Sequence, residues 1–233
     1  MPELNPKLLS GKFVVFDGPD GCGKTTQMTN LIARLEKLGG ESPGTPVIRR
    51  LREPGGTVIG EEVRKILLST EHDKMDMHCE MLLYMASRAQ LVAEQIRPAL
   101  AAGECVMADR FASSTLAYQG GGGGLEIEQI LAVAQAAVGA SKTHPGYWPD
   151  VTLIFDLDVD VAMARLNPQQ SAGLFQDRIE QRAKDYFQRV RENYLWQVKQ
   201  WPERYRLIDA SKTVAQVEKQ VNKVLAEFFA GKA

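Results

Sequence analysis

A short glycine-rich segment constrains this chain more than any other feature of its sequence. Residues 18–25 read GPDGCGKT and fit the pattern G-x-x-x-x-G-K-[ST]. The apolar residues 12–17 before it predict a buried strand, and apolar residues at helical spacing follow from Lys24. Glycines let consecutive backbone N–H groups turn inward around a phosphate, and the following helix directs its positive end at the same anion. The segment therefore predicts a phosphate-binding loop. A turn that merely connects two elements is the alternative, and the flanking strand and helix argue against it.

The end of this loop indicates which phosphates are bound. Lys24 can bridge the β- and γ-phosphates of a nucleotide, and the Thr25 hydroxyl can bind Mg²⁺. We therefore expect ATP or GTP at the loop. The predicted contacts of the nucleotide phosphates are Gly18, Pro19, Asp20, Gly21, Cys22, Gly23, Lys24, Thr25 and Thr26.

Short apolar segments alternate with longer amphipathic segments along the rest of the chain. The predicted strands are residues 12–17, 47–51, 105–108, 151–157 and 205–209. The predicted helices are residues 24–39, 58–69, 76–102, 125–140, 160–166, 177–200 and 214–229, the third of them bent or capped near Pro98. This alternation predicts an α/β fold in which helices cover both faces of a five-stranded parallel sheet. No linker divides the chain, so we expect one domain over residues 1–233 with a core of about 12–229. Ligands of such a fold bind at the carboxyl ends of the strands.

Composition narrows the class of protein. The chain has 28 Lys and Arg against 29 Asp and Glu, so its net charge of −1 creates no global field for nucleic acid or anionic lipid. No apolar run approaches the roughly 18–20 residues of a membrane helix, and the start of the chain lacks the pattern of a secretion signal. The three cysteines are widely spaced, which argues against a disulfide framework or a zinc site. We expect a cytoplasmic enzyme without nucleic-acid or membrane partners.

Two further arginines are expected at the same edge of the sheet as the loop. Arg52 follows the second strand on the tight bend 54–56 (PGG), and Asp109 and Arg110 follow the third strand. In isolation, the alternatives are a solvent-exposed arginine and a local salt bridge. Together with Lys24, the two arginines would form an anion-binding cleft. Two phosphate groups come together in a cleft without water only if positive charges compensate their negative charge. A phosphate acceptor is already an oxyanion and needs no strong general base. The pattern therefore favours a nucleotide kinase.

Six motifs, in order and at the expected separations, resemble the thymidylate kinase family. They are GPDGCGKTT (18–26), REPGGT (52–57), YMASR (84–88), DR (109–110), AYQG (117–120) and DRIE (177–180). REPGGT together with AYQG is specific to that family among kinases with such a phosphate loop. The resemblance extends from about Lys12 to Asp209. It implies the P-loop NTPase fold of nucleoside monophosphate kinases, with a mobile lid. It also implies transfer of the γ-phosphoryl group of ATP to dTMP in dTTP biosynthesis, a requirement for Mg²⁺, and a homodimer.

The resemblance also implies roles for the residues around the acceptor phosphate and sugar. Asp20 would lie near the 3′-hydroxyl of dTMP, and Arg52 and Arg110 would grip its phosphate. Tyr118 would lie under the sugar and crowd out a ribose 2′-hydroxyl. Asp109 would lie with Thr25 on the Mg²⁺ side.

The base would be bound by a second group of residues. Tyr84 would stack on thymine, and Arg88, on the same helix face at spacing i, i+4, would bond a thymine carbonyl. Without the resemblance, Tyr84 reads as a core aromatic residue. Ser114 and Gln119 would supply polar contacts around the base, and the last strand would end beside adenine at 209–210.

The resemblance does not by itself identify the residue that supplies one catalytic cation. Some relatives carry a catalytic arginine inside the phosphate loop, but this chain has Cys22 there, so the cation should come from a lid at about 165–178. Residues 167–176 contain no basic residue, which leaves Arg165, Arg178 and Arg182. We predict that Arg178 is the main lid cation, because it starts a helix after a flexible segment. The predicted catalytic residues are Lys24, Arg110, Arg178 and Asp20.

Two features remain outside this scheme. The glycine run 120–124 reads as a flexible connector. Cys22 lies near a helix N-terminus, where the pKa of a thiol tends to fall, so it is either a redox sensor or, as we expect, a small residue that fills the loop.

Other functions stay open as alternatives. A deoxynucleoside kinase, or another nucleoside monophosphate kinase, would use a similar sheet. A deoxynucleoside kinase acts on a hydroxyl acceptor and needs no phosphate grip, so Arg52 argues against it. A nucleotide-dependent switch protein would usually carry the guanine-binding pattern N-K-x-D, but here Asn222 and Lys223 are followed by valine and leucine.

Overall fold

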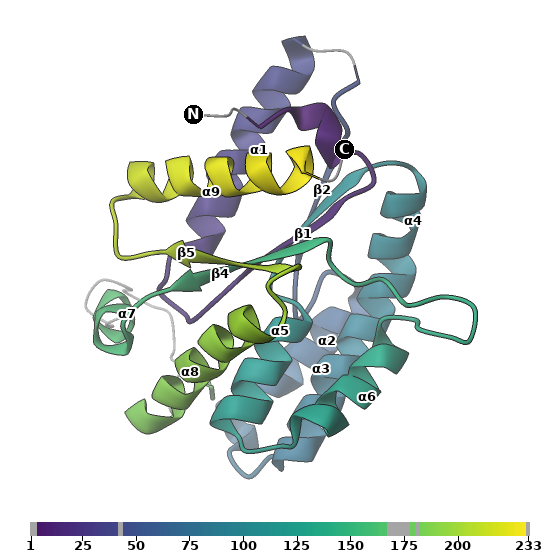
Figure 1. The fold of residues 1–233 in the computed structure, drawn as a ribbon. Helices are drawn as coiled ribbons and strands as arrows, with labels where there is room; N and C mark the ends of the chain where they lie inside the picture. Colours follow the sequence, from purple (N-terminus) through teal and green to yellow (C-terminus); the bar gives the residue numbers. More distant parts are fainter. Residues whose placement is uncertain (1–3, 42–43, 167–177, 180–181, 232–233) are drawn as a thin grey trace.

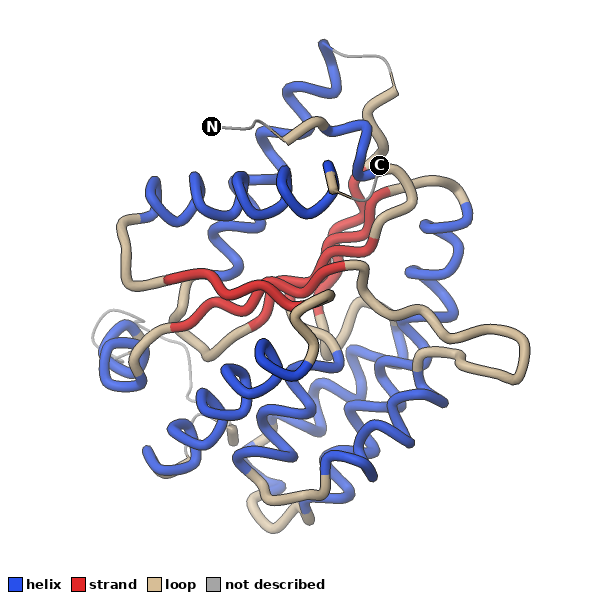
Figure 2. Tube along the Cα trace, in the orientation of Figure 1, coloured by secondary structure: helices blue, strands red, loops and turns tan. Residues whose placement is uncertain are grey.

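The computed structural model describes residues 4–41, 44–166, 178–179 and 182–231. It confirms the predicted five-stranded parallel sheet, with strand order β2-β3-β1-β4-β5. The strands lie between helices on both sides (Figure 2). The strands are β1 (Phe13–Asp17), β2 (Ile48–Arg52), β3 (Cys105–Asp109), β4 (Val151–Asp156) and β5 (Tyr205–Asp209). The residues of β1 and β3 are all buried, because helices cover both faces of the sheet.

Helices form a layer on each face of the sheet (Figure 1). Alternate residues of β1 face the two layers. Val14 and Phe16 pack in the core with α1 (Lys24–Glu41) and α9 (Val214–Ala230). Phe13 and Val15 pack in the core with α3 (Met77–Leu91) and the segment after it. The helices are α1 (Lys24–Glu41), α2 (Val58–Leu68), α3 (Met77–Leu91), α4 (Arg97–Ala101), α5 (Ala112–Thr115), α6 (Ile127–Ala137), α7 (Val159–Arg165), α8 (Lys184–Gln200) and α9 (Val214–Ala230). Short 3₁₀ segments are η1 (Pro6–Leu9) and η2 (Thr70–His72), and π-helical segments are η3 (Val92–Ile96) and η4 (Leu116–Gly122). No helix among the described residues has both the length and the apolar character of a membrane span.

Two predicted helices differ from the observed ones. The stretch predicted over 76–102 is helical from Met77 to Ala101, but the π-helical segment η3 lies within it, directly before Pro98. The helix predicted from residue 177 begins only at Lys184, so Arg178 does not start a helix. Residues 167–177 of the predicted lid lie outside the described residues.

The glycine run is packed, so the expectation of a flexible connector is wrong for residues 120–123. A Cβ atom on Gly122 would lie 2.6 Å from the Tyr186 ring, and one on Gly121 would lie 2.9 Å from the Arg189 carbonyl oxygen, both on α8. A Cβ atom on Gly123 would lie 2.6 Å from the sulfur of Met77. The missing side chains therefore allow η4 to pack directly against α8.

Candidate active site

A cavity of about 280 Å³ opens at the carboxyl ends of the central strands. The eight residues predicted for the acceptor nucleotide all line it, as do Lys24, Thr25 and Asp109. The eight are Asp20, Arg52, Tyr84, Arg88, Arg110, Ser114, Tyr118 and Gln119. Tyr84 is only partly buried and faces this cavity, as an aromatic residue that stacks on a ligand would. The structure therefore brings the predicted residues together at one cavity, and their roles stay predictions.

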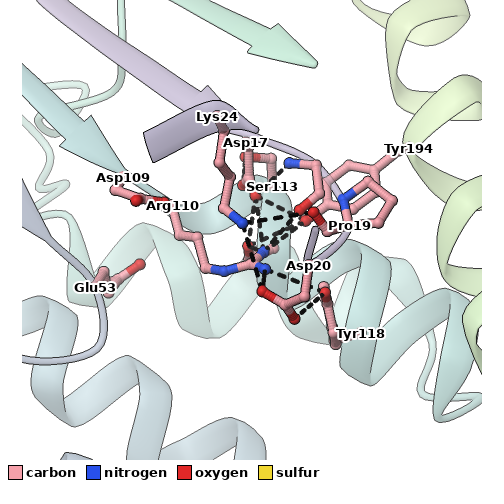
Figure 3. A network of polar contacts seen from close by, with 12 residues as sticks. Asp17, Pro19, Asp20, Lys24, Glu53, Asp109, Arg110, Ser113, Tyr118 and Tyr194 are labelled. Carbon is pink, nitrogen blue, oxygen red and sulfur yellow. Dashed lines mark hydrogen bonds and ion pairs between the residues drawn. The ribbon is translucent and has the colours of Figure 1, made fainter. Parts of the chain in front are cut away.

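Arg110 is the centre of the polar network at the phosphate end of the cavity (Figure 3). It follows β3 with a φ of 72°, in the left-handed region that side chains rarely adopt. Its Nη1 atom donates to Ser114 Oγ (2.9 Å) and Asp17 Oδ1 (3.2 Å), and its Nη2 atom donates to Asp20 Oδ1 (2.6 Å) and Tyr118 OH (3.2 Å). The guanidinium lies 5.1 Å from the centre of the Tyr118 ring. The cation is thus held in place before any anion arrives.

Asp17 is a site residue that the sequence reading missed. It is fully buried at the end of β1 and accepts hydrogen bonds from Ser114 Oγ (2.7 Å), Tyr194 OH (2.7 Å) and the Gly18 N–H (2.8 Å), and from Ser113 Oγ. A carboxylate at the end of an otherwise apolar strand was the available signal. Its role is to fix the start of the phosphate loop and one edge of Arg110.

Burial and the charges around the loop shift the pKa values of Asp20 and Cys22. Burial raises the pKa of Asp20, but Arg110 and Lys24 and the hydrogen bonds from Arg110 and Tyr118 outweigh that effect, so the pKa lies well below its usual range. Asp20 is therefore a carboxylate at neutral pH. Burial raises the pKa of the Cys22 thiol, in contrast to the depression expected at a helix N-terminus. Cys22 is a buried core residue, as its loop-filling interpretation predicts.

Thr25 and Asp109 form an oxygen pair beside Lys24. The Thr25 hydroxyl donates to Asp109 Oδ2 at 2.5 Å, and both residues line the cavity. Hydroxyl and carboxylate oxygens suit Mg²⁺, which is typically held by one or two protein ligands together with phosphates and water. Among the described residues no cluster of three or more His, Cys, Asp or Glu could hold a metal ion by itself. The pair therefore fits an ion that arrives with a nucleotide.

Arg88 also lines the cavity and is fully buried. It pairs with Glu53 Oε2 at 2.7 Å, donates to Thr115 Oγ1 at 2.9 Å, and lies over the Phe111 ring. Burial raises the pKa of Glu53, and the charge of Arg88 opposes that shift. The Nε atom of Arg88 has no hydrogen-bond partner within the described part of the chain. An unpaired buried donor at the cavity wall is suited to a ligand carbonyl.

Arg52 extends toward solvent from the end of β2. Its Nη2 atom lies 3.1 Å from Glu61 Oε1, and the Gly56 N–H donates to the same oxygen at 2.8 Å. The Gly56 hydrogen bond, together with Arg52, lowers the pKa of Glu61. Arg52 is thus anchored on α2 and still lines the cavity.

The three predicted lid arginines lie in two places. Arg165 ends α7 and donates to the Gly21 carbonyl oxygen of the phosphate loop at 3.4 Å. Arg178 is buried and pairs with Glu80, and Arg182 donates to the same carboxylate at 2.6 Å. None of the described contacts of Arg178 or Arg182 involves the phosphate loop. The function predicted for Arg178 stays a prediction. In the described part of the structure, it is Arg165 that contacts the phosphate loop.

Comparison with known proteins shows the family of this chain. The model of the thymidylate kinase family matches residues 16–221. A thymidylate kinase of Pseudomonas syringae pv. tomato is 41% identical over 219 residues, which cover 94% of this chain and 97% of that protein. One of Paraburkholderia xenovorans is 41% identical over 216 residues, covering 93% and 98%. The crystal structure of thymidylate kinase from Ehrlichia chaffeensis matches with a TM-score of 0.70 and 29% identity, and covers 92% of this chain and 97% of that one.

Proposed function

The chain belongs to the thymidylate kinase family, and from that premise we infer that it transfers the γ-phosphoryl group of ATP to dTMP. It is a nucleoside monophosphate kinase, a phosphotransferase whose products are ADP and dTDP, and it serves dTTP synthesis. The observation that carries this function is the shared cavity. One space is bordered by the phosphate loop on one side and by the residues of the family's acceptor motifs on the other.

The residues of the cavity account for the binding of dTMP. Arg110 and Arg52 would bind the acceptor phosphate, because both are cations on the wall of the cavity and Arg110 is already oriented by Asp17 and Asp20. The carboxylate of Asp20 would accept a hydrogen bond from the 3′-hydroxyl, and Tyr118 would limit the space around the sugar. Tyr84 would stack on the base, and the unpaired Nε of Arg88 supports a bond to a thymine carbonyl.

The transfer step needs positioning and charge neutralisation. An oxygen of the dTMP phosphate attacks the γ-phosphorus of ATP, and the bond from that phosphorus to the bridging oxygen of ADP breaks. The loop N–H groups and Lys24 would bind the phosphates and stabilise the charge that moves to the leaving oxygen. Because the attacking oxygen is already anionic, no side chain has to remove a proton. Arg165 would add a cation from the end of α7, and Arg178 is the alternative that the sequence indicates.

Mg²⁺ is proposed as the ion of this reaction. Thr25 and Asp109 would hold it, since their oxygens lie side by side next to the phosphate loop. When bound, it would neutralise charge on the transferring phosphates.

A panel of acceptors tests this function. ATP turnover should depend on dTMP and should be much lower with UMP or with thymidine. Thymidine accepted as well as dTMP would instead indicate a deoxynucleoside kinase. ATP hydrolysis that is independent of every acceptor would indicate a nucleotide switch.

We also propose that the enzyme is a homodimer in the cytoplasm. The exposed apolar residue Leu82 on α3, together with Ile59 and Ile66 on α2, supports a subunit contact at these helices. A molar mass of about twice 25.8 kDa in light scattering, and recovery in the soluble cell fraction, are the expected results. A monomer at micromolar concentration would contradict the dimer.

A further inference from the structure

A buried carboxylate beside the cavity takes no part in the reaction described above. Glu80 lies on α3 and is fully buried. Its Oε1 atom accepts a hydrogen bond from Gln119 Nε2 at 2.8 Å, and its Oε2 atom accepts from Arg182 at 2.6 Å and from Arg178. Donors from separate parts of the chain therefore converge on one side chain, and one of them, Gln119, lines the cavity.

The chemistry of these groups determines how the Gln119 amide is turned. Both oxygens of the Glu80 carboxylate accept hydrogen bonds, from Gln119 on one side and from two guanidinium groups on the other. An amide has one end that donates, the NH₂ group, and one that accepts, the carbonyl oxygen. Because Glu80 only accepts, Gln119 must turn its NH₂ group toward it. The carbonyl oxygen is then the end of the amide that remains for a ligand in the cavity.

The two arginines make this arrangement stable. A single carboxylate buried without a counter-charge is very costly. With Arg178 and Arg182 paired to its Oε2 atom, Glu80 remains an acceptor.

We propose that Glu80 is a positioning residue that fixes the Gln119 carbonyl toward the base and so selects pyrimidines that carry a hydrogen on N3. Thymine and uracil have an N3–H that donates to a carbonyl, whereas N3 of cytosine is an acceptor and would oppose it. The proposal rests on the dTMP kinase function and on the base lying at the Arg88 and Gln119 end of the cavity.

The test replaces the carboxylate by an amide of the same shape. In Glu80→Gln, residue 80 can present either end of its amide, so Gln119 is free to turn. We expect the ratio of kcat/KM for dTMP to that for dCMP to fall roughly tenfold or more, as the orienting bond to a charged group is lost. The ratio for dTMP to dUMP should stay constant, because these two bases share the N3–H and the neighbouring carbonyl groups.

The two ratios of kcat/KM distinguish a loss of base selectivity from a general loss of stability. A general loss of stability lowers the three rates together and leaves both ratios unchanged. Glu104→Gln is the matched control, since it removes a carboxylate paired with Arg49 at the start of β3, away from the cavity. An unchanged dTMP-to-dCMP ratio in folded Glu80→Gln overturns the proposal. A wild-type enzyme that does not phosphorylate dTMP overturns the proposed function instead.

A second measurement needs no variant and covers the case in which Glu80→Gln does not fold. In a neutron structure of the wild-type enzyme with dTMP, the deuterons on Gln119 Nε2 should point to Glu80, and the bare oxygen should face N3 of the base. Deuterons directed at the base would overturn the proposal.

Discussion

Individual residues show where reading the sequence succeeds and where it ends. Arg110 and Asp109 could be placed because the end of a parallel strand is a position that the pattern itself identifies. Asp17 and Glu53 also lie at strand ends but were missed, and Glu80, on α3, has no such position. Their functions depend on partners that only the fold brings close, as when Arg88 meets Glu53 across 35 positions of the chain. The function of a buried carboxylate can be predicted only when the residue that supplies its counter-charge is known.

The strained backbone of Arg110 is consistent with a preorganised anion site. A side chain in the left-handed region costs on the order of 1–3 kcal/mol and persists only where its surroundings hold it. Here the surroundings are two carboxylates, three hydroxyl groups, the Gly18 carbonyl oxygen and the Tyr118 ring. The same bonds keep the guanidinium beside the loop, so an acceptor phosphate that binds as proposed would not have to order this cation first.

Arg52 provides the test at this scale. In Arg52→Ala, we expect the KM for dTMP to rise roughly 10- to 100-fold, because a hydrogen bond between charged groups is lost. The KM for ATP should change less than about threefold, since the loop that binds ATP is left intact. Steady-state kinetics with each substrate varied in turn measures both values.

The control for this variant lies on the same strand. Arg49→Ala removes an arginine of β2 that pairs with Glu104 and does not line the cavity, so both KM values should stay near those of the wild type. Equal increases of the two KM values in Arg52→Ala would contradict an acceptor role for Arg52.

At the scale of elements, the helices and strands were predictable from periodicity, but their closest contact was not. Periodicity indicates which face of a helix is apolar. It gives no signal where two elements approach closely because glycines lack side chains. The run of glycines at 120–123 reads as flexible for that reason, yet it forms η4 and the contacts with Tyr186 on α8 and Met77 on α3. Distinguishing these two cases requires the partner helix, which lies more than sixty positions away in the chain.

We expect different kinetic effects from removing Arg165, at the end of α7, and Arg178, before α8. In Arg165→Ala, we expect kcat to fall roughly 100-fold with little change in the KM for dTMP, because a cation beside the loop would act mainly on the transition state. In Arg178→Ala, we expect mainly a higher KM for dTMP, because Glu80 then loses a partner and Gln119 is held less firmly. Single-turnover rates with saturating dTMP separate the two effects.

The sequence-based alternative makes the reverse prediction. If Arg178 contacts the transferring phosphoryl group, its removal lowers kcat strongly and Arg165→Ala has the smaller effect. Lys184→Ala is a suitable control, since it removes an exposed cation at the start of α8 that pairs with Asp160.

At the scale of the molecule, the parallel sheet explains why so much of the site was predictable. Each strand ends at the same edge, so motifs far apart in sequence, after β1, β2 and β3, meet without any knowledge of side-chain packing. The base-binding end also depends on α3 and η4, whose position relative to the sheet follows from packing rather than from strand order. That end was assigned through the family resemblance and not through spacing.

This arrangement predicts how the whole molecule responds to dTMP. The ligand would contact the phosphate loop, β2, α3 and η4, so its binding energy stabilises the fold as one unit. At a concentration of about 100 times its Kd, dTMP should stabilise the protein by about 2.7 kcal/mol and raise Tm by roughly 5 °C or more. We expect one cooperative transition in calorimetry, as the predicted single domain requires. The same concentration of dCMP is the matched control and should move Tm much less. Two transitions, of which dTMP shifts only one, would contradict a single domain over residues 1–233 and would confine the ligand's contacts to part of the chain.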